Sequence, residues 1–378
     1  RRRSLSILLS LVMTVGSLSG LFPSVSFAEE QSEVEAFLSE ANNMSVTNNV
    51  YGMDDLILHY DMKTTDTVNE KVIINDVSSS GRGLNGTLKN PAGGELVRNE
   101  QVGFAAFNGG SSTSNSSYIE IPKDSSGLDL LSGLSSITVS SLVNWDNDGA
   151  NRWIFGLGTV TSNAETGHRY FFATPRHGVT NTTRPIAAGL SKGGWRNEAL
   201  ITGSSTLASG DWKLVTVVFS ETQDTLSIFV DGVKLTSGPA KGIKLSELID
   251  PTSGFSGFLG KSIFTTDNYL KGKIADFRVY DRSFTEDEVA TLFTETTDTI
   301  PKLRQLTLDN ATTSLELTPY LASGDNVLGV TKQLTLPTVG KNGVALSWSS
   351  DNTVVVANNG NVTRPSALAE DVQVQLTA

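Results

Sequence analysis

Short stretches of alternating apolar and polar residues run through the chain between residues 56 and 280. In the clearest one, Leu226, Ile228 and Val230 alternate with polar neighbours, which is the period of a half-buried strand. Asp231-Gly232 follows at once and favours a two-residue hairpin turn with positive φ angles. Similar stretches predict strands at 56–61, 104–108, 118–121, 137–145, 153–156, 170–173, 212–219, 255–260 and 274–280.

A short helix is expected soon after the last of these strands. Thr285 and Glu288 have the spacing of a capping box, and the apolar residues that follow recur at helical spacing. Many short strands, Gly-rich turns and one terminal helix predict an all-β fold, an antiparallel sandwich of two sheets. Long loops are expected at 146–152, 161–168 and 174–198, and binding residues usually lie on such loops.

Residues 302–378 differ in character from the preceding part. Residues 294–301 are rich in Thr and Asp and end on a proline, which indicates a domain boundary. Short β segments then follow at 334–337, 344–348, 354–356, 360–363 and 372–376, separated by Gly, Asn and Asp. They predict a small immunoglobulin-like sandwich, incomplete at its C-terminal edge, with Trp348 as its buried tryptophan.

The first 28 residues have the pattern of a secretory signal peptide. Three arginines precede an apolar run at 5–15, and Ser26-Phe27-Ala28 offers small residues for cleavage after Ala28. An uncleaved anchor is the alternative, but the run is short for a membrane-spanning helix of roughly 20 residues.

We therefore expect a signal peptide (1–28), a linker (29–53), a first domain (54–296), a linker (297–304) and a truncated second domain (305–378). Because the chain starts with Arg and stops within a strand pattern, we expect a longer parent protein.

Charge and cysteine content narrow the functional classes. Removing residues 1–28 takes away three positive charges and no negative ones, so the net charge changes from −11 to −14. Such an acidic chain is a poor partner for nucleic acid or anionic lipid, and we expect no membrane insertion after cleavage. There are no cysteines, which excludes thiol chemistry and favours export from a Gram-positive bacterium over an animal extracellular setting.

Six motifs in one order carry a resemblance to a known superfamily. They are LILHY (56–60), DVSSSGRGLNGTL (76–88), FAAFNG (104–109), YIEIP (118–122), the strand at 137–143 and the block from 211 to 293. Together they resemble the laminin-G-like, concanavalin-A-like lectin/glucanase superfamily in its bacterial form, which implies a jelly-roll sandwich. Residues 334–352 and 359–365 are similar to the atrophied bacterial immunoglobulin domain. The pair resembles the non-catalytic front of secreted glycoside hydrolases of arabinofuranosidase type, an architectural analogy.

Aromatic and charged residues in the loops are candidates for sugar binding. Sugars present apolar C–H faces and hydroxyl edges, so their sites combine aromatic rings with hydrogen-bonding groups. We select Tyr170, Arg176, His177, Trp195 and Arg196 as carbohydrate-binding candidates. Alternation places Tyr170 on the opposite strand face from the residue after it, and one of these faces packs in the core. Trp195 follows two glycines, and binding and packing are equally open for it.

A structural Ca²⁺ is a further hypothesis, with Asp76 and Asp276 as ligands. Asp76 begins a turn whose carbonyls could complete the six to eight oxygen ligands that calcium takes. Alternation places Asp276 on one strand face with Ile274, Arg278 and Tyr280, near positions where lectin-like relatives hold calcium. The alternatives are a turn-forming role for Asp76 and an ion pair between Asp276 and Arg278.

The sequence gives no indication of a catalytic centre. Glycoside hydrolysis needs two carboxyl groups set about 5–10 Å apart, whereas the adjacent acids at 286–288 suit the first turn of a helix. We therefore expect a non-catalytic module that binds a plant-type polysaccharide, arabinan or xylan, and whose parent protein is a secreted glycoside hydrolase. An extracellular adhesive or structural role without glycan specificity is the alternative, and a degenerate glucanase is a third possibility.

Overall fold

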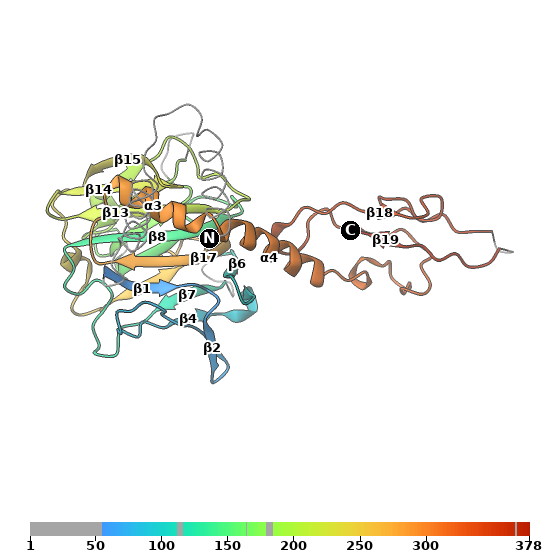
Figure 1. The fold of residues 1–378 in the computed structure, drawn as a ribbon, viewed down its shortest axis with the longest axis horizontal. Coiled ribbons are helices and arrows are strands. Elements are labelled where there is room, and N and C mark those ends of the chain that lie inside the picture. The colour runs from blue at the N-terminus through green and yellow to red at the C-terminus, as the bar shows by residue number, and fades with distance from the viewer. Residues whose placement is uncertain (1–54, 112–115, 164, 179–183, 367–368) are drawn as a thin grey trace, which may run out of the picture. The chain divides into compact units, whose positions relative to one another are not determined.

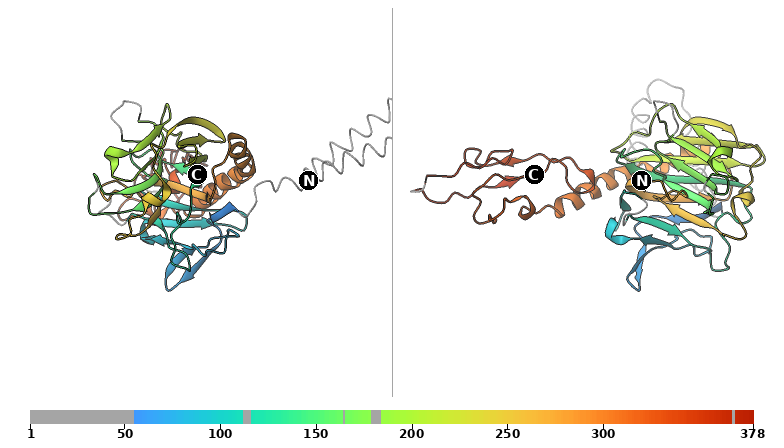
Figure 2. Two further views of the ribbon diagram at one scale, coloured as in Figure 1. Left: turned by 90° about the vertical axis from the view of Figure 1, so that its left-hand side faces the viewer. Right: turned by 180° about the vertical axis from the view of Figure 1, so that it is seen from behind.

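The computed structural model describes residues 55–111, 116–163, 165–178, 184–366 and 369–378. The expected signal peptide and leader linker therefore lie outside the described residues. From Asp55 onward the chain is nearly all β, with two antiparallel sheets packed as a jelly-roll sandwich and a small C-terminal sheet region (Figure 1, Figure 2). This confirms the predicted fold class.

The two sheets of the sandwich contain eight and nine strands, and their paired strands are antiparallel. In spatial order, the eight-stranded sheet consists of β15 (Val233–Pro239), β14 (Thr225–Val230), β13 (Lys213–Ser220), β8 (Ser136–Trp145), β17 (Lys271–Tyr280), β6 (Gly103–Asn108) and β5 (Gly94–Arg98), and β1 (Leu56–Tyr60) also pairs with β17. The nine-stranded sheet consists of β12 (Ala199–Thr202), β11 (Ala187–Ser191), β10 (Arg169–Thr174), β9 (Phe155–Thr159), β16 (Ser256–Leu259), β7 (Tyr118–Ile121), β4 (Gly86–Lys89), β3 (Lys71–Ile74) and β2 (Thr65–Val68).

Helical segments are short and lie mostly between or after the strands. They are η2 (Pro91–Gly93), η3 (Trp195–Asn197), η4 (Leu245–Leu248), α3 (Glu286–Thr296), α4 (Thr299–Thr313), η5 (Thr318–Tyr320) and η6 (Lys341–Gly343). Helix α3 packs against β13 and β15 of the eight-stranded sheet.

Aromatic side chains from both sheets meet in the core of the sandwich. Phe277 of β17 lies 6.1 Å, between ring centroids, from Phe155 of β9, and Phe219 of β13 lies 6.4 Å from Phe171 of β10. All four side chains are fully buried. Each contributes about 1.5–3 kcal/mol relative to an exposed side chain, so these contacts hold the two sheets together.

Local turn and cap signals in the sequence are confirmed. Asp231 and Gly232 have φ values of 50° and 78° between β14 and β15, as a tight hairpin turn requires. The Thr285 side chain accepts a hydrogen bond from the amide of Glu288, whose carboxylate accepts one from the Thr285 amide. Both features depend only on neighbouring residues, which explains why the sequence reveals them.

Simple alternation fails in β17. A β-bulge shifts the pairing with β8 between Ile274 and Asp276. Ile274 therefore packs in the core with Phe277 and Val279, instead of sharing the face of Asp276 and Arg278 as expected. A bulge inserts one extra residue into a strand, so the alternation on its two sides is out of phase.

Several strands were not expected. The segment 174–198, interpreted as one long loop, contains β11 and the turn η3, and β9 begins two residues later than predicted. Strand β11 has the sequence AAGLS and is buried along its whole length. A strand that is buried on both faces lacks the alternation on which the prediction depends.

The expected linker 297–304 is helical. Helix α4 runs from Thr299 through this segment, with Pro301 in its first turn, where a proline is tolerated because the amide it lacks has no helical acceptor. The following region contains the two-stranded pair β18 (Ser349–Ser350) and β19 (Leu376–Thr377) and isolated bridges such as Val356 to Val362. Trp348 is half-buried there, and its Nε1 donates to the carbonyl of Pro337 at 2.8 Å.

Candidate functional site

An aromatic layer covers the outer face of the nine-stranded sheet. Phe172 of β10 points away from the main core, and its ring stacks on that of Trp153, with centroids 4.2 Å apart. Phe172 pairs with Gly156 on one neighbouring strand and with Gly189 on the other. A Cβ at Gly189 would lie 2.7 Å from the Phe172 ring, so glycine provides the room in which this ring lies.

Tyr170, His177 and Glu198 come together beside this layer and form what we call the Glu198 cluster. The Tyr170 hydroxyl donates a 2.7 Å hydrogen bond to Glu198 Oε1, and His177 Nε2 lies 3.9 Å from Glu198 Oε2. Tyr170 is fully buried, so its ring is not presented to a ligand, and its polar contact is with Glu198. Two of the sequence candidates, Tyr170 and His177, are thus brought together by a residue that the sequence analysis did not select.

Burial shifts the pKa values of the Glu198 cluster. It raises the pKa of Glu198 to about 7, although the Tyr170 hydroxyl and Lys241 oppose the shift. It lowers the pKa of His177 to about 4. Although the His177–Glu198 distance is within ion-pair range, His177 is therefore neutral near pH 7 and the contact is not an ion pair.

Trp195 and Arg196 form an exposed aromatic–cation pair on the turn between β11 and β12. The Trp195 side chain is 51% exposed, and the Arg196 guanidinium carbon lies 4.9 Å from the ring centroid. Arg196 also pairs with Glu165 at 3.4 Å, from the loop between β9 and β10. Of the two roles left open for Trp195, exposure excludes burial in the core.

Gly194 fixes the turn that presents Trp195. Its φ of 71° lies in the left-handed region, and its amide donates to the carbonyl of His168 at 2.7 Å. A Cβ at this position would lie 1.8 Å from the carbonyl oxygen of Glu165. Any other residue would therefore separate the two loops that carry Trp195, Arg196 and Glu165.

Arg176 belongs to a different group of contacts. Its Nη1 donates to Asn147 Oδ1 at 3.2 Å, and its carbonyl accepts from the amide of Asn151 at 2.8 Å. These partners lie on the loop between β8 and β9. The contacts therefore join two loops, and they do not include the Trp195–Arg196 pair.

Two buried carboxyl groups were missed by the sequence analysis. Besides Glu198, Asp267 has a pKa that burial raises to about 6, and it accepts a 2.8 Å hydrogen bond from the Ser262 hydroxyl. Single acids in polar loops are usually solvated, so nothing in the local sequence marks these two. For Glu198, the one feature of the sequence that could have suggested its burial is its position directly before the alternating residues of β12.

The proposed calcium ligands Asp76 and Asp276 are joined through His59. Asp76 Oδ1 accepts from the amides of His59 and Ser78, both at 3.0 Å. Asp276 binds the Arg278 guanidinium through both oxygens, at 2.9 and 3.0 Å, and lies 3.3 Å from His59 Nε2. Burial alone would raise the pKa of Asp276, but Arg278 and His59 hold it well below the usual range.

These contacts do not fit a calcium ion shared by the two acids. Asp276 faces a guanidinium, so a second cation at the same oxygens would be repelled. Within the described ranges, no group of three or more His, Asp or Glu side chains could hold a metal ion. Asp276 therefore forms an ion pair with Arg278, which is the alternative role named for it above. Calcium binding at the Asp76 turn stays a prediction.

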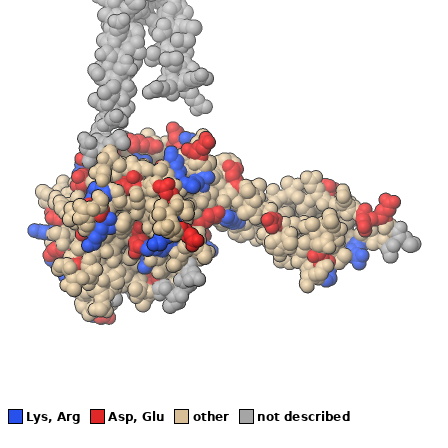
Figure 3. Space-filling view, turned by 90° about the horizontal axis from the view of Figure 1, so that it is seen from below, with Lys and Arg blue, Asp and Glu red and all other residues tan. Residues whose placement is uncertain are grey.

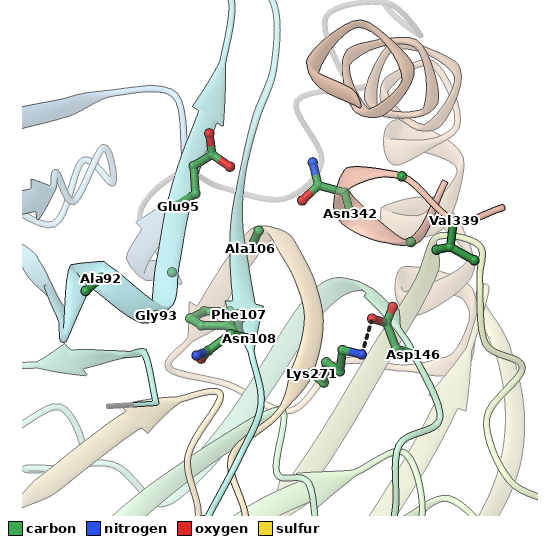
Figure 4. A pocket seen from close by; sticks show the side chains of 13 residues that line it. Ala92, Gly93, Glu95, Ala106, Phe107, Asn108, Asp146, Lys271, Val339 and Asn342 are labelled. Atoms are coloured by element: carbon green, nitrogen blue, oxygen red, sulfur yellow. Dashed lines mark ion pairs between the residues drawn. The ribbon is translucent and has the colours of Figure 1, made fainter. Parts of the chain in front are cut away.

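One pocket, of about 440 Å³, lies away from the predicted sugar residues (Figure 4). Its lining includes Glu95, Phe107, Asn108, Asp146, Lys271 and Asn342. Asp146 lies 4.0 Å from Lys271, and Glu95 is paired with Lys341 at 2.8 Å. Because its charged groups are already paired with protein partners, we assign the pocket no ligand.

The face of the protein that Figure 3 shows has no concentrated patch of basic side chains. Basic and acidic side chains are interspersed there over the sandwich. Across the part of the chain that the structure describes, no helix combines the length and the apolar character needed to cross a membrane.

Two family models match the chain in the order that its motifs indicate. Residues 113–290 match the concanavalin A-like lectin/glucanases superfamily. Residues 308–378 match the atrophied bacterial Ig domain. The two matched regions are therefore similar to a concanavalin A-like lectin/glucanase domain and to an atrophied bacterial Ig domain, in agreement with the resemblance of their motifs.

Comparison with solved structures finds similar chains of low sequence identity. One is domain 4 of AbnA, a GH43 extracellular arabinanase from Geobacillus stearothermophilus, in complex with arabinotriose; it is 17% identical, with a TM-score of 0.45, over 63% of this chain and 98% of that one. Another is the binding domain of botulinum neurotoxin DC in complex with rat synaptotagmin II, 15% identical, with a TM-score of 0.43, over 64% of this chain and 52% of that one. The same toxin domain in complex with SialylT matches at 15% identity and a TM-score of 0.42, with the same coverage. A comparison with curated proteins gives no match.

Proposed function

We propose that the chain is a non-catalytic carbohydrate-binding module with a spacer region, from the N-terminal part of a secreted polysaccharide-degrading protein. The observation that carries the proposal is the exposed ring of Trp195. Among the exposed large hydrophobic side chains in the described part of the chain, Trp195 is the one aromatic residue, and aromatic rings are the surfaces on which the C–H faces of sugars pack. Arg196 lies against the ring and pairs with Glu165 of the neighbouring loop at 3.4 Å, and these contacts position the ring.

The chemistry around Trp195 suits a sugar ring. The indole face can pack against the C–H face of a pyranose or furanose, while Arg196 and Glu165 offer a donor and an acceptor for its hydroxyls. The Glu198 cluster lies next to this turn and fixes the base of the loop. The fold supplies a stable scaffold, and the loops carry the recognition.

The finer parts of the proposal concern substrate and location. We propose a plant-type polysaccharide, with arabinan and xylan as the first candidates, because of the domain pairing that the sequence resembles. We also propose secretion from a Gram-positive bacterium, on the basis of the signal-peptide pattern and the absence of cysteine. The module would act by raising the local concentration of a neighbouring enzyme at its polymer.

Titration calorimetry with arabinan and xylan tests the proposal. The purified chain should bind one of them saturably, and Trp195→Ala should weaken the affinity about tenfold or more with an unchanged melting temperature. Val233→Ala is the matched control, because Val233 is 65% exposed on the hairpin of the other sheet. A glycan affinity that Trp195→Ala leaves unchanged would contradict the role given to Trp195, whereas binding to protein partners and to no glycan would favour the adhesive alternative. Release of reducing ends by the purified chain would contradict the non-catalytic assignment.

A further inference from the structure

The ammonium group of Lys261 is surrounded by three aromatic rings. Its Nζ lies 4.2 Å from the ring centroid of Tyr118, 4.3 Å from that of Phe258 and 5.7 Å from that of Tyr269. We call these four residues the Lys261 cage. No sequence feature selected the cage as a unit, because its members come from β7, β16 and the segment that follows β16.

The rings of the Lys261 cage hold one another in place. Tyr118 meets Phe258 edge-on at 5.6 Å and Tyr269 edge-on at 5.7 Å. The amide of Tyr269 donates to the carbonyl of Gly110 at 2.9 Å, which fixes the segment that carries this ring. Phe258 and Tyr269 are buried, whereas Tyr118 and Lys261 are partly exposed. A ligand can therefore reach the cage from the side of Tyr118 and Lys261.

Lys261 lacks a counter-ion within the described part of the chain. No carboxylate there lies within ion-pair distance of its Nζ, and no oxygen there accepts a hydrogen bond from it. The nearby acid Glu120 is paired with Lys89 at 2.6 Å. By contrast, the partly buried Lys213 has Asp231 at 2.7 Å. The cage thus carries one uncompensated positive charge in a protein with a net charge of −11.

Ring faces attract an ammonium group but do not accept its three N–H donors as a carboxylate does. Burial lowers the pKa of Lys261 while the charge of Glu120 raises it, so an added anion would favour the charged form further. The exposed part of Tyr118 offers an apolar ring beside these donors. An aromatic surface next to an unpaired cation suits a sugar that has both a C–H face and a carboxylate.

We propose that the Lys261 cage is a second saccharide contact, separate from Trp195, that recognises a uronic acid residue of the bound polysaccharide. The inference rests on the proposed carbohydrate-binding function and adds a sugar class to it. The uronate carboxylate accepts hydrogen bonds from Lys261 Nζ, and the sugar ring packs on Tyr118. Glu120 is already paired with Lys89 at the edge of the cage, so Lys261 has no carboxylate partner of its own among the described residues.

The test compares one polymer in two forms. Glucuronoxylan and the same polymer with its carboxyl groups chemically reduced are titrated into the full chain and into Lys261→Met, which keeps the length of the side chain. We expect the full chain to bind the acidic form about tenfold more tightly, and Lys261→Met to lose that preference while binding the reduced form unchanged. Lys234→Met is the matched control, since Lys234 lies on β15 of the other sheet and pairs with Glu286 of helix α3.

The possible outcomes separate this inference from the proposed function. Equal binding of both polymer forms by the full chain, or a preference that Lys261→Met retains, would overturn the cage proposal while leaving the Trp195 proposal intact. No binding to either form would overturn the cage proposal, and the proposed function would be contradicted only if arabinan were not bound either. If Lys261→Met does not fold, two measurements replace it. Lys261→Arg should keep the preference, and the affinity of the full chain for the acidic form should fall with added salt while that for the reduced form stays constant. The opposite result in either would contradict the proposal.

Discussion

The hydroxyl of Tyr170 on β10 donates a 2.7 Å hydrogen bond to Oε1 of Glu198, which directly precedes β12, on the far side of β11 in the nine-stranded sheet. This bond connects the strand β10 to the turn that presents Trp195. It also holds a carboxyl group in a place from which most water is excluded, since the Glu198 side chain is 11% exposed. The consequences for stability and pH dependence can be measured.

Glu198→Gln should stabilise the protein at pH 7 and above, and progressively less as the pH falls toward 4.5. Because burial raises the pKa of Glu198 from 4.5 to about 7, the folded state binds more protons than the unfolded state between these values. The contribution of Glu198 to the free energy of unfolding is therefore present below pH 4.5 and is lost as the pH rises through 7. At pH 8 we expect the variant to be more stable than the parent by about 3 kcal/mol, and at pH 5 nearly equal to it.

Chemical denaturation of both proteins at pH 5 and pH 8 measures this difference, and contributions from His177 and Asp267 cancel because both proteins contain them. Glu165→Gln is the control, since Glu165 is 59% exposed. A stability difference that does not change with pH would show that Glu198 titrates normally.

Gly189→Ala should destabilise the sandwich through the aromatic layer. The added methyl group would lie 2.7 Å from Phe172 Cε1 and 3.4 Å from Glu198 Cγ, so the ring must shift. Overpacking of this kind costs about 1–3 kcal/mol, measured by urea denaturation. The same change at Gly329, where the nearest atom would be 3.8 Å away, should alter stability by less than about 0.5 kcal/mol. Similar small effects at both positions would mean that the layer repacks freely.

Asp276→Ala should be strongly destabilising. Removing this carboxylate leaves the Arg278 guanidinium, whose side chain is 20% exposed, without its two-pronged partner and costs about 3–5 kcal/mol. Asp211→Ala breaks a similar two-pronged pair with Arg304 on the surface, where the loss should stay below about 1 kcal/mol. Thermal unfolding of the two variants distinguishes the buried pair from the exposed one. Equal losses would show that Asp276 contributes little through its pair.

The calcium hypothesis for the Asp76 turn predicts a metal-dependent melting temperature. Ca²⁺ at millimolar concentration should raise the melting temperature of the EDTA-treated chain, because a ligand that binds only the folded state stabilises it. Asp76→Asn should abolish the rise, whereas Asp66→Asn, on the exposed strand β2, should retain it. A melting temperature that does not respond to calcium would leave Asp76 with the turn-forming contacts to His59 and Ser78.

Local patterns in the sequence determined much of the sandwich. The Asp231-Gly232 hairpin, the Thr285–Glu288 capping box and most strands of the eight-stranded sheet follow from neighbouring residues. Each depends on backbone preferences or on alternation, which act over a few residues. The small second region follows less closely, because the structure contains there only the short pair β18 and β19 and isolated bridges, whereas five longer β segments were predicted.

Only the tertiary structure decided which loop residues meet. Tyr170 and Trp195 are both aromatic residues near polar neighbours, yet one is buried against Glu198 and the other is half exposed beside Arg196. Likewise, Lys261 is one lysine among many until three rings from distant segments surround it. The physical reason is that burial and pairing depend on contacts between residues far apart in sequence. The sequence by itself determined the scaffold, and the packing of the strands and loops decided which side chains a ligand can reach.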